Sequence, residues 1–303
     1  MNMDYSVVTS HALPAVTGHA RHAVLAAARA AAMQGDAATL AVVLETDGST
    51  YVAPGAIALF GAAVGQVGWL SGGCLEPEIE RIAIESARMS RIAWMEVDTR
   101  DDEDLLSGSA LGCRGRLRIA LLPLRAMPGI AAPLAAWLAG RTSLRIEVHA
   151  DGAVSLMTDA IDAVVCGWRI ATAAPAWASA TPMWALRVDA RPELLVFGAG
   201  PETPTLLPLL RAMGWMTTLA ERRERWRAQP MLADRHLALS PADALRASQP
   251  LDAALVMHHN FELDREALAA LADDDTRFIG LLGPVRRRED LFRVLPAAHR
   301  AAL

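Results

Sequence analysis

The sequence contains no lysine and has few aromatic residues or cysteines. All 29 of its basic residues are arginine, and aromatic residues make up 5% of the 303-residue chain. The arginine-rich composition by itself says little about function. The three cysteines, Cys74, Cys113 and Cys166, are an odd number, and their spacing matches no zinc motif. Free thiols in a reducing compartment are therefore a simpler interpretation than a disulfide framework.

The sequence also lacks a long apolar run, a secretory signal and an excess of positive charge. A transmembrane helix needs roughly 20 consecutive apolar residues, and no such run occurs. Residues 1–17 lack the basic and apolar regions of a signal peptide. The net charge of −5 and the isoelectric point near 5.9 argue against nucleic-acid binding, which needs a basic face. We therefore expect a cytoplasmic protein with no nucleic-acid partner and no integral membrane segment.

Length and composition predict two domains, because a chain of 303 residues with 53% hydrophobic content can bury more than one core of the usual size. The pattern of strands and helices predicts an α/β protein. Short strands with glycine turns indicate an N-terminal α+β domain over residues 1–180, with its core at 18–125. Alternating strands and helices predict a Rossmann-like domain with a parallel sheet over residues 190–303. The Ala- and Pro-rich segment 171–182 is the predicted linker.

The strongest local signal is a cysteine between a glycine turn and a helix. A short strand is predicted at 66–70, then Ser71, Gly72 and Gly73, and Pro77 opens a helix with one apolar face. Cys74 therefore lies just before a helix N-terminus, where exposed N–H groups and the helix dipole favour a thiolate. The alternative is a small buried cysteine in a tight turn.

Two further segments of the N-terminal half are candidate sites. Cys113 is also flanked by glycines, Gly112 and Gly115, and precedes a strand predicted at 116–124. The acidic run 98–104 could bind Mg²⁺ or Ca²⁺, but most such runs are solvated loops. Cys166 has no glycine setting and is interpreted as a core residue.

A dinucleotide-binding pattern opens the second half. The strand predicted at 193–197 is followed by Gly198-Ala-Gly200, a helix, a second strand and Glu221. In such units the helix N-terminus binds a pyrophosphate and the acid binds a ribose hydroxyl. Pro201, Thr203 and Pro204 depart from the pattern, since proline removes amide donors. Further along, His258 and His259 end a strand, at the edge where open α/β sheets bind ligands.

Taken together, these blocks resemble the XdhC/CoxI family of molybdenum-cofactor chaperones over roughly residues 40 to 290. The resemblance lies in an ordered series of motifs, which are Gly48-Ser49-Thr-Tyr-Val-Ala-Pro-Gly55-Ala56, Ser71-Gly-Gly-Cys74-Leu-Glu76, Gly112-Cys113-Arg-Gly115, Gly198-Ala-Gly200, Glu221-Arg-Arg223, Met257-His-His259 and Phe278-Ile-Gly-Leu-Leu-Gly283. Tyr51 and Val52 replace a Pro-Arg pair of the family pattern, and Pro201 replaces a histidine.

The resemblance implies a function and a set of binding residues. Such proteins bind molybdenum cofactor (molybdopterin), protect it during sulfuration by a cysteine desulfurase, and deliver it to a xanthine dehydrogenase-type molybdenum hydroxylase. The implied cofactor-binding residues are Gly48, Ser49, Gly72, Gly73, Cys74, Glu76, Cys113, Gly198, Gly200, Glu221 and His259. Cys74 is the residue expected to contact molybdenum or its transferable sulfur, because a thiolate is a soft ligand.

The sequence also gives expectations for the location of the site, the assembly and an alternative function. The cofactor site is expected between the cysteine-bearing domain and the sheet edge of the Rossmann-like domain. A homodimer is one expected assembly. The alternative function is an NAD(P)-dependent oxidoreductase, with Gly198 and Gly200 at the cofactor. The proline-crowded turn and the absence of a placed acid–base pair favour the chaperone over the oxidoreductase.

Overall fold

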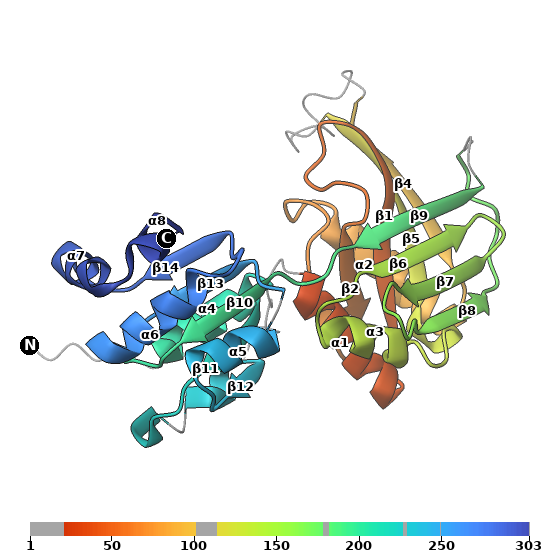
Figure 1. Ribbon diagram of the computed structural model, residues 1–303. Coiled ribbons are helices and arrows are strands. Elements are labelled where there is room, and N and C mark those ends of the chain that lie inside the picture. The colour runs from red at the N-terminus through yellow and green to blue at the C-terminus, as the bar shows by residue number, and fades with distance from the viewer. Residues whose placement is uncertain (1–20, 101–113, 178–181, 227–228, 249, 303) are drawn as a thin grey trace, which may run out of the picture. The chain divides into compact units, whose positions relative to one another are not determined.

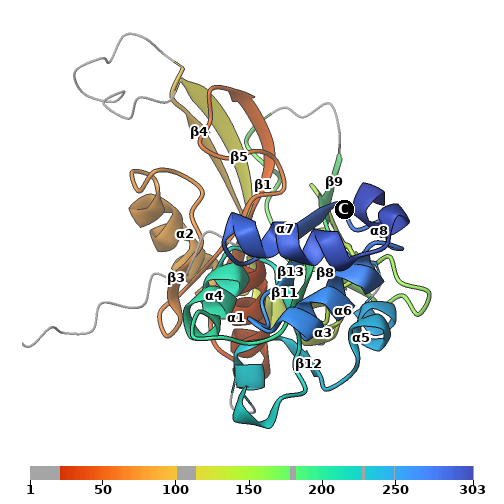
Figure 2. The ribbon, with the colours of Figure 1, turned by 60° about the vertical axis from the view of Figure 1, so that its left-hand side comes forward.

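The computed structural model describes residues 21–100, 114–177, 182–226, 229–248 and 250–302 (Figures 1 and 2). The chain divides into two compact units, with the boundary between Ala190 and Arg191. None of the described helices is long and apolar enough to cross a membrane.

The first unit contains an antiparallel sheet whose central strand is buried on both faces. The strand order is β3-β2-β1-β5-β4, with bounds Ala38–Gly48 for β1, Ile57–Gly61 for β2, Gly65–Val67 for β3, Ala93–Asp98 for β4 and Gly115–Pro123 for β5. Because successive side chains alternate between faces, Leu40 and Val42 pack on one side of β1, and Ala41 and Val43 on the other.

Each face of this sheet is covered by a helix. The helix α1 (Arg21–Gln34) contributes Val24 and Leu25 to the first face, and α2 (Glu76–Met89) contributes Ile79 and Ala83 to the second (Figure 1). The apolar face predicted for α2 is therefore confirmed. Ser86 on the same face is buried and donates its hydroxyl to the carbonyl oxygens of β5 and of the turn after the helix.

A second antiparallel sheet completes the first unit. Its order is β8-β7-β6-β9, with bounds Leu144–His149 for β6, Ala153–Thr158 for β7, Val165–Arg169 for β8 and Met183–Val188 for β9. Together with α3 (Ala131–Leu138) and the short 3-10 turn η2 (Leu124–Ala126), it shares one apolar core with α1 and the first sheet. Trp137 and Trp184 are among the residues that fill this core.

The segment predicted as the interdomain linker lies within the first unit instead. The N–H of Ile92 donates to the carbonyl oxygen of Ala171 (3.0 Å), and Trp94 Nε1 donates to that of Ala173 (2.8 Å). The segment leads from β8 to β9, which pairs with β6. The prediction was wrong because an Ala- and Pro-rich composition is typical of a linker, whereas the place of this segment depends on β9, which pairs with residues far from it in the sequence.

One predicted element end also differs from the structure. The strand expected at 66–70 ends early, after β3, where Gly68 adopts a φ of +88°. That backbone conformation interrupts an extended strand.

The second unit is a Rossmann-like fold with a parallel sheet. The order is β12-β11-β10-β13-β14, with bounds Glu193–Phe197 for β10, Met216–Ala220 for β11, Arg235–Leu237 for β12, Ala253–Val256 for β13 and Phe278–Leu281 for β14. The helices are α4 (Thr203–Ala212), α5 (Pro241–Ser248), α6 (Phe261–Leu271), α7 (Val285–Val294) and α8 (Ala297–Ala302), with 3-10 turns η3 (Glu224–Trp226) and η4 (Gln229–Leu232). The helix α4 packs on one face, and α5, α6 and α7 contribute to the core on the other (Figure 2).

A buried ion pair secures the start of this unit. Arg191 is 2% exposed and lies 3.3 Å from Asp234 Oδ2, which also accepts the N–H (2.9 Å) and hydroxyl (3.0 Å) of Thr217. Burial raises the pKa of Asp234, but the bonds from Thr217 and the arginines outweigh it and hold that pKa below its ordinary value. Burial lowers the pKa of Arg191, since desolvation there outweighs its pairing with Asp234, yet a guanidinium stays protonated at neutral pH.

We predict that Asp234→Ala destabilises the second unit by about 3 kcal/mol, because it leaves a buried guanidinium without its counter-charge. Urea unfolding followed by circular dichroism measures the loss. The control Glu85→Ala removes an exposed pair with Arg88 on α2 and should leave the unfolding curve unchanged.

The same substitution should show a defined pH dependence. The folded-state pKa of Asp234 is depressed, so its contribution is complete above the unfolded pKa of about 3.9 and is lost as the pH falls through the folded value. The difference between wild type and Asp234→Ala should therefore be constant from pH 7 to about 5 and shrink below about pH 4. A difference that does not change down to pH 3 would contradict the ion-pair explanation.

Candidate functional site

The turn before α2 is held by a carboxylate that folds back onto it. Glu76 is 3% exposed, and its Oε1 accepts the N–H groups of Leu70 (3.0 Å) and Ser71 (2.7 Å). Its Oε2 accepts the hydroxyl of Ser71, whose oxygen in turn accepts the N–H groups of Gly73 (3.2 Å) and Leu75 (3.1 Å). Glu76 and Ser71 therefore fix the turn from within, and both Glu76 oxygens are engaged by the chain.

Cys74 is exposed at the outer side of this turn. Its Sγ lies 3.6 Å from Ser71 Oγ, and Leu75, the N-cap residue of α2, follows it directly. The predicted placement before a helix N-terminus is confirmed, and the alternative of a buried cysteine is not. Gly73 has a φ of +103°, whereas a Cβ on Gly72 would meet nothing within 4 Å. The backbone conformation at Gly73 thus favours glycine, and Gly72 faces open space.

The other predicted residues of the first unit have structural contacts. Gly48 has a φ of +74°, and a Cβ there would lie 2.5 Å from the carbonyl oxygen of Arg114. The N–H of Ser49 donates to that same oxygen (3.0 Å). Gly48 and Ser49 therefore close the first sheet against the start of β5. Cys113 and residues 101–104 of the acidic run lie outside the described residues.

Cys166, expected in the core, is instead half-buried on β8, an edge strand of the second sheet. Its Sγ lies 3.9 Å from the carbonyl oxygen of Gly129. The expectation was wrong because the surrounding strand alternates between exposed and partly buried positions rather than being fully covered.

In the second unit, the glycine turn after β10 is shaped by contacts with the histidines after β13. Gly198 has a φ of +90°, and a Cβ there would lie 2.5 Å from His258 Cα. A Cβ on Gly200 would lie 2.5 Å from Glu202 Oε2 and 3.1 Å from His259 Nε2. Gly198 is thus required by its positive φ and by the backbone of His258, whereas the atoms near Gly200 are the ends of the flexible Glu202 and His259 side chains.

Glu221, predicted to bind a ribose, instead accepts bonds from the glycine turn. Its side chain is 1% exposed, and its Oε2 accepts the N–H of Ala199 (2.7 Å). Its Oε1 accepts the N–H of Arg223 (2.7 Å), whose guanidinium also bonds to the carboxylate. Burial raises the pKa of Glu221, but the bonds from Arg223 and Ala199 outweigh it and hold that pKa below its ordinary value.

Arg223 joins three loops at this edge and was not among the predicted site residues. Besides Glu221, its guanidinium donates to the carbonyl oxygens of His258 (2.8 Å) and Ala199 (2.9 Å). The signal for it was present, because Arg223 ends the Glu-Arg-Arg block. A buried acid followed by an arginine is a pattern that points to an internal pair as readily as to a ligand.

The two adjacent histidines have different environments. His258 is buried, and Asp264 Oδ1 accepts its N–H (3.0 Å) and faces its Nδ1 (3.2 Å), while Oδ2 lies 2.5 Å from Arg287 Nη2. Burial raises the pKa of Asp264, but His258 and Arg287 outweigh it and hold that pKa low. His259 adopts a φ of +53°, is exposed, and lies with Nε2 3.3 Å from Glu202 Oε2. His259 is therefore the histidine available to a ligand.

A cavity of about 470 Å³ opens at this edge of the sheet, and its lining residues are Pro201, Glu202, Arg225, Trp226 and His259. Of these, only His259 was a predicted site residue. Glu202, Arg225 and Trp226 lie in loops and in the short turn η3, where no motif marks them. Gly198, Gly200 and Glu221 support the cavity from within the chain.

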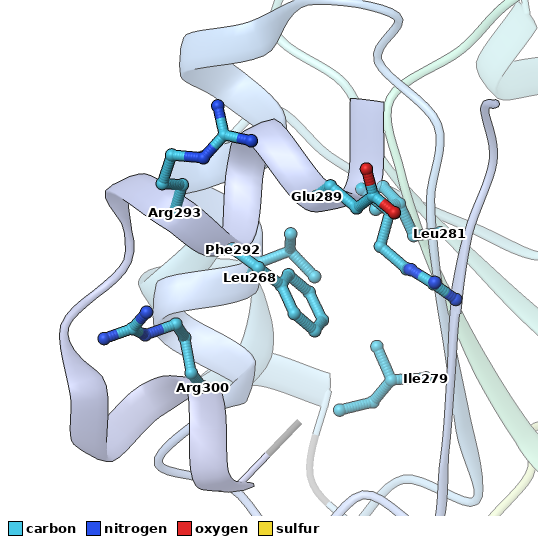
Figure 3. A pocket seen from close by; sticks show the side chains of 8 residues that line it. Leu268, Ile279, Leu281, Glu289, Phe292, Arg293 and Arg300 are labelled. Carbon is cyan, nitrogen blue, oxygen red and sulfur yellow. The ribbon is translucent and has the colours of Figure 1, made fainter. Parts of the chain in front are cut away.

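A second cavity, of about 700 Å³, lies elsewhere in the same unit (Figure 3). Figure 3 shows Phe292 and Ile279 near its centre, with Arg293 and Arg300 together on one side. No predicted site residue lines it. Within the described part of the chain, no three His, Cys, Asp or Glu side chains come together to form a metal site.

Comparisons with known proteins match both units. The description "XdhC Rossmann domain" matches residues 194–302, and "XdhC and CoxI family" matches residues 31–94. A protein of Bacillus subtilis (strain 168) described as a probable xanthine dehydrogenase subunit is 27% identical over 282 residues, which cover 86% of this chain and 83% of that protein. A crystal structure described as a xanthine dehydrogenase from Bacillus halodurans matches with a TM-score of 0.69 and 26% identity, covering 90% of this chain and 86% of that one.

We predict that NAD(H) binds weakly or not at all. Pro201 supplies no N–H at the helix N-terminus, Glu202 places a negative charge there, and Glu221 is engaged by Arg223 and the turn. Isothermal titration calorimetry with NADH tests this expectation. A dissociation constant in the low micromolar range would show that the turn still accepts a pyrophosphate.

Proposed function

The chain belongs to the XdhC and CoxI family, and we propose that it is an accessory protein of a xanthine dehydrogenase-type molybdenum hydroxylase. It would bind molybdenum cofactor, hold it during sulfuration by a cysteine desulfurase, and deliver it to the apo-hydroxylase. The two similar proteins whose names contain xanthine dehydrogenase support this choice of client. The single observation that carries the proposal is the exposed Cys74 thiol on its internally braced turn.

The residues around Cys74 fit a soft-metal cofactor. The bound cofactor would supply a molybdenum–sulfur centre. Thiolate sulfur is the side-chain donor best suited to such a centre. Because Glu76 bonds to the turn itself, no carboxylate of that motif competes for the metal. The thiol of Cys74 is exposed, so a ligand can reach it from solvent. We assign the contact with molybdenum or its transferable sulfur to Cys74.

Glu76 and Ser71 have a different role in this proposal. They orient the turn, since four N–H groups donate to Glu76 or Ser71 and the Ser71 hydroxyl donates to Glu76. Gly48 and Ser49 likewise shape the fold rather than touch a ligand. In the second unit, the exposed groups available to a ligand are those that line the cavity beside His259.

The oxidoreductase alternative has less support. It requires the glycine turn to bind pyrophosphate and Glu221 to bind a ribose, and the turn N–H of Ala199 already bonds to Glu221. A carrier needs affinity and protection of its cargo, and neither requires an acid–base pair. The contacts of the turn therefore favour the accessory function.

We predict that Cys74→Ala keeps the fold and loses cofactor retention. The side chain is small and exposed, so the stability loss should be below about 1 kcal/mol. Wild type and variant are loaded anaerobically with molybdenum cofactor and desalted, and molybdenum per chain is measured. Cys113→Ala should show a similar or milder defect.

Cys166→Ala is the matched control, because it removes the same group from an edge strand that takes no part in the proposed site. It should retain molybdenum as wild type does. Equal retention by wild type and Cys74→Ala would end the thiolate assignment.

A further inference from the structure

One wall of the cavity beside His259 is made by a cation–π pair of side chains. The guanidinium of Arg225 lies over the indole of Trp226, 4.9 Å from the ring centroid, and both residues line the cavity. Stacked arginine and tryptophan planes are the surfaces on which proteins hold planar heterocycles. The wall therefore suits a flat aromatic ring.

Glu202 supplies a carboxylate to the same cavity. Glu202 is the N-cap residue of α4, yet its side chain makes no capping hydrogen bond. It extends instead toward His259, with Oε2 3.3 Å from Nε2, and its side chain is 46% exposed. An ionised carboxylate only accepts hydrogen bonds, so this group calls for a ligand with N–H donors.

We propose that this cavity binds a 2-amino-4-oxopyrimidine ring edge through Glu202, with the ring against the Arg225–Trp226 wall. That edge carries a ring N–H beside an amino group, two adjacent donors that match the two oxygens of one carboxylate. Adenine and cytosine present an acceptor next to their amino group, which would face a carboxylate oxygen unfavourably. The ring edge is shared by pterin and guanine, so the carboxylate selects this class over adenine and cytosine.

The choice of ligand rests on the proposed function, since molybdenum cofactor contains a pterin and its dinucleotide forms add a base. The position of the Glu202 carboxylate favours binding of the cofactor's ring over binding of its phosphate end. Glu202 lies at the start of α4 after Pro201, so this helix N-terminus repels a phosphate and lacks one amide donor. A neutral ring with N–H donors is the part of the cofactor that gains from this charge.

The test is calorimetry of the full chain with neopterin, GMP, AMP and CMP. Glu202→Gln replaces one acceptor oxygen with a donor at the same volume and should weaken neopterin binding by roughly tenfold or more. Glu262→Gln changes an exposed glutamate on α6 that does not line the cavity, and should leave binding unchanged. Trp226→Leu removes the wall and should also weaken binding. Melting curves confirm that each variant is folded.

The nucleotide titrations identify the source of the ring. If neopterin binds more tightly than GMP, the cavity is assigned to the pterin portion of the cofactor. If GMP binds more tightly, the cavity is assigned to the guanine of a dinucleotide form. Affinities for AMP or CMP equal to that for neopterin, or equal neopterin binding by wild type and Glu202→Gln, would overturn the proposal.

Molybdenum retention by Glu202→Gln separates this inference from the proposed function. If wild type and Glu202→Gln retain molybdenum equally well, the ring assignment is overturned and the proposed function stands. If wild type binds neopterin, Glu202→Gln weakens that binding, and wild type retains no molybdenum, the ring assignment is supported and the proposed function is overturned. Reduced retention by Glu202→Gln supports both.

Discussion

A carboxylate buried among main-chain N–H groups is costly unless those groups bond to it, and this constraint shapes each turn that carries candidate functional residues. Glu76 accepts two N–H groups of the Cys74 turn, Glu221 accepts one from the glycine turn, and Asp264 accepts that of His258. In each case, the acid fixes the backbone from inside and is thereby removed from ligand binding. The residues left facing solvent are then held in place by bonds made elsewhere.

What remains for a ligand is a small set of groups with distinct chemistry. In the first unit it is the exposed thiol of Cys74. In the second unit it is the cavity lined by Glu202, His259 and a cation–π pair of arginine and tryptophan. The thiol suits a metal–sulfur centre, and the cavity suits a ring with N–H donors.

The sequence predicted the strongly patterned parts of the molecule well. The strand at 193–197, the apolar face of α2 and the placement of Cys74 are confirmed, because a buried apolar run, a helical period and a proline at a helix start are local signals. The second sheet of the first unit was predicted only in part, since the pairing of β9 with β6 joins residues far apart in the sequence. For the same reason no local pattern could reveal that Glu202 and Trp226 share a cavity.

In the proposed function, Cys74 is the group of the first unit that touches the cofactor. Alkylation by iodoacetamide, followed by mass spectrometry of the full chain with and without bound molybdenum cofactor, tests this role. We expect Cys74, which is exposed in the structure, to react readily alone and at least about tenfold more slowly when cofactor is bound, because a metal-bound thiolate is not a free nucleophile. Cys166 serves as the internal reference and should react at the same rate in both states. Equal reaction rates for Cys74 with and without retained cofactor would contradict the claim.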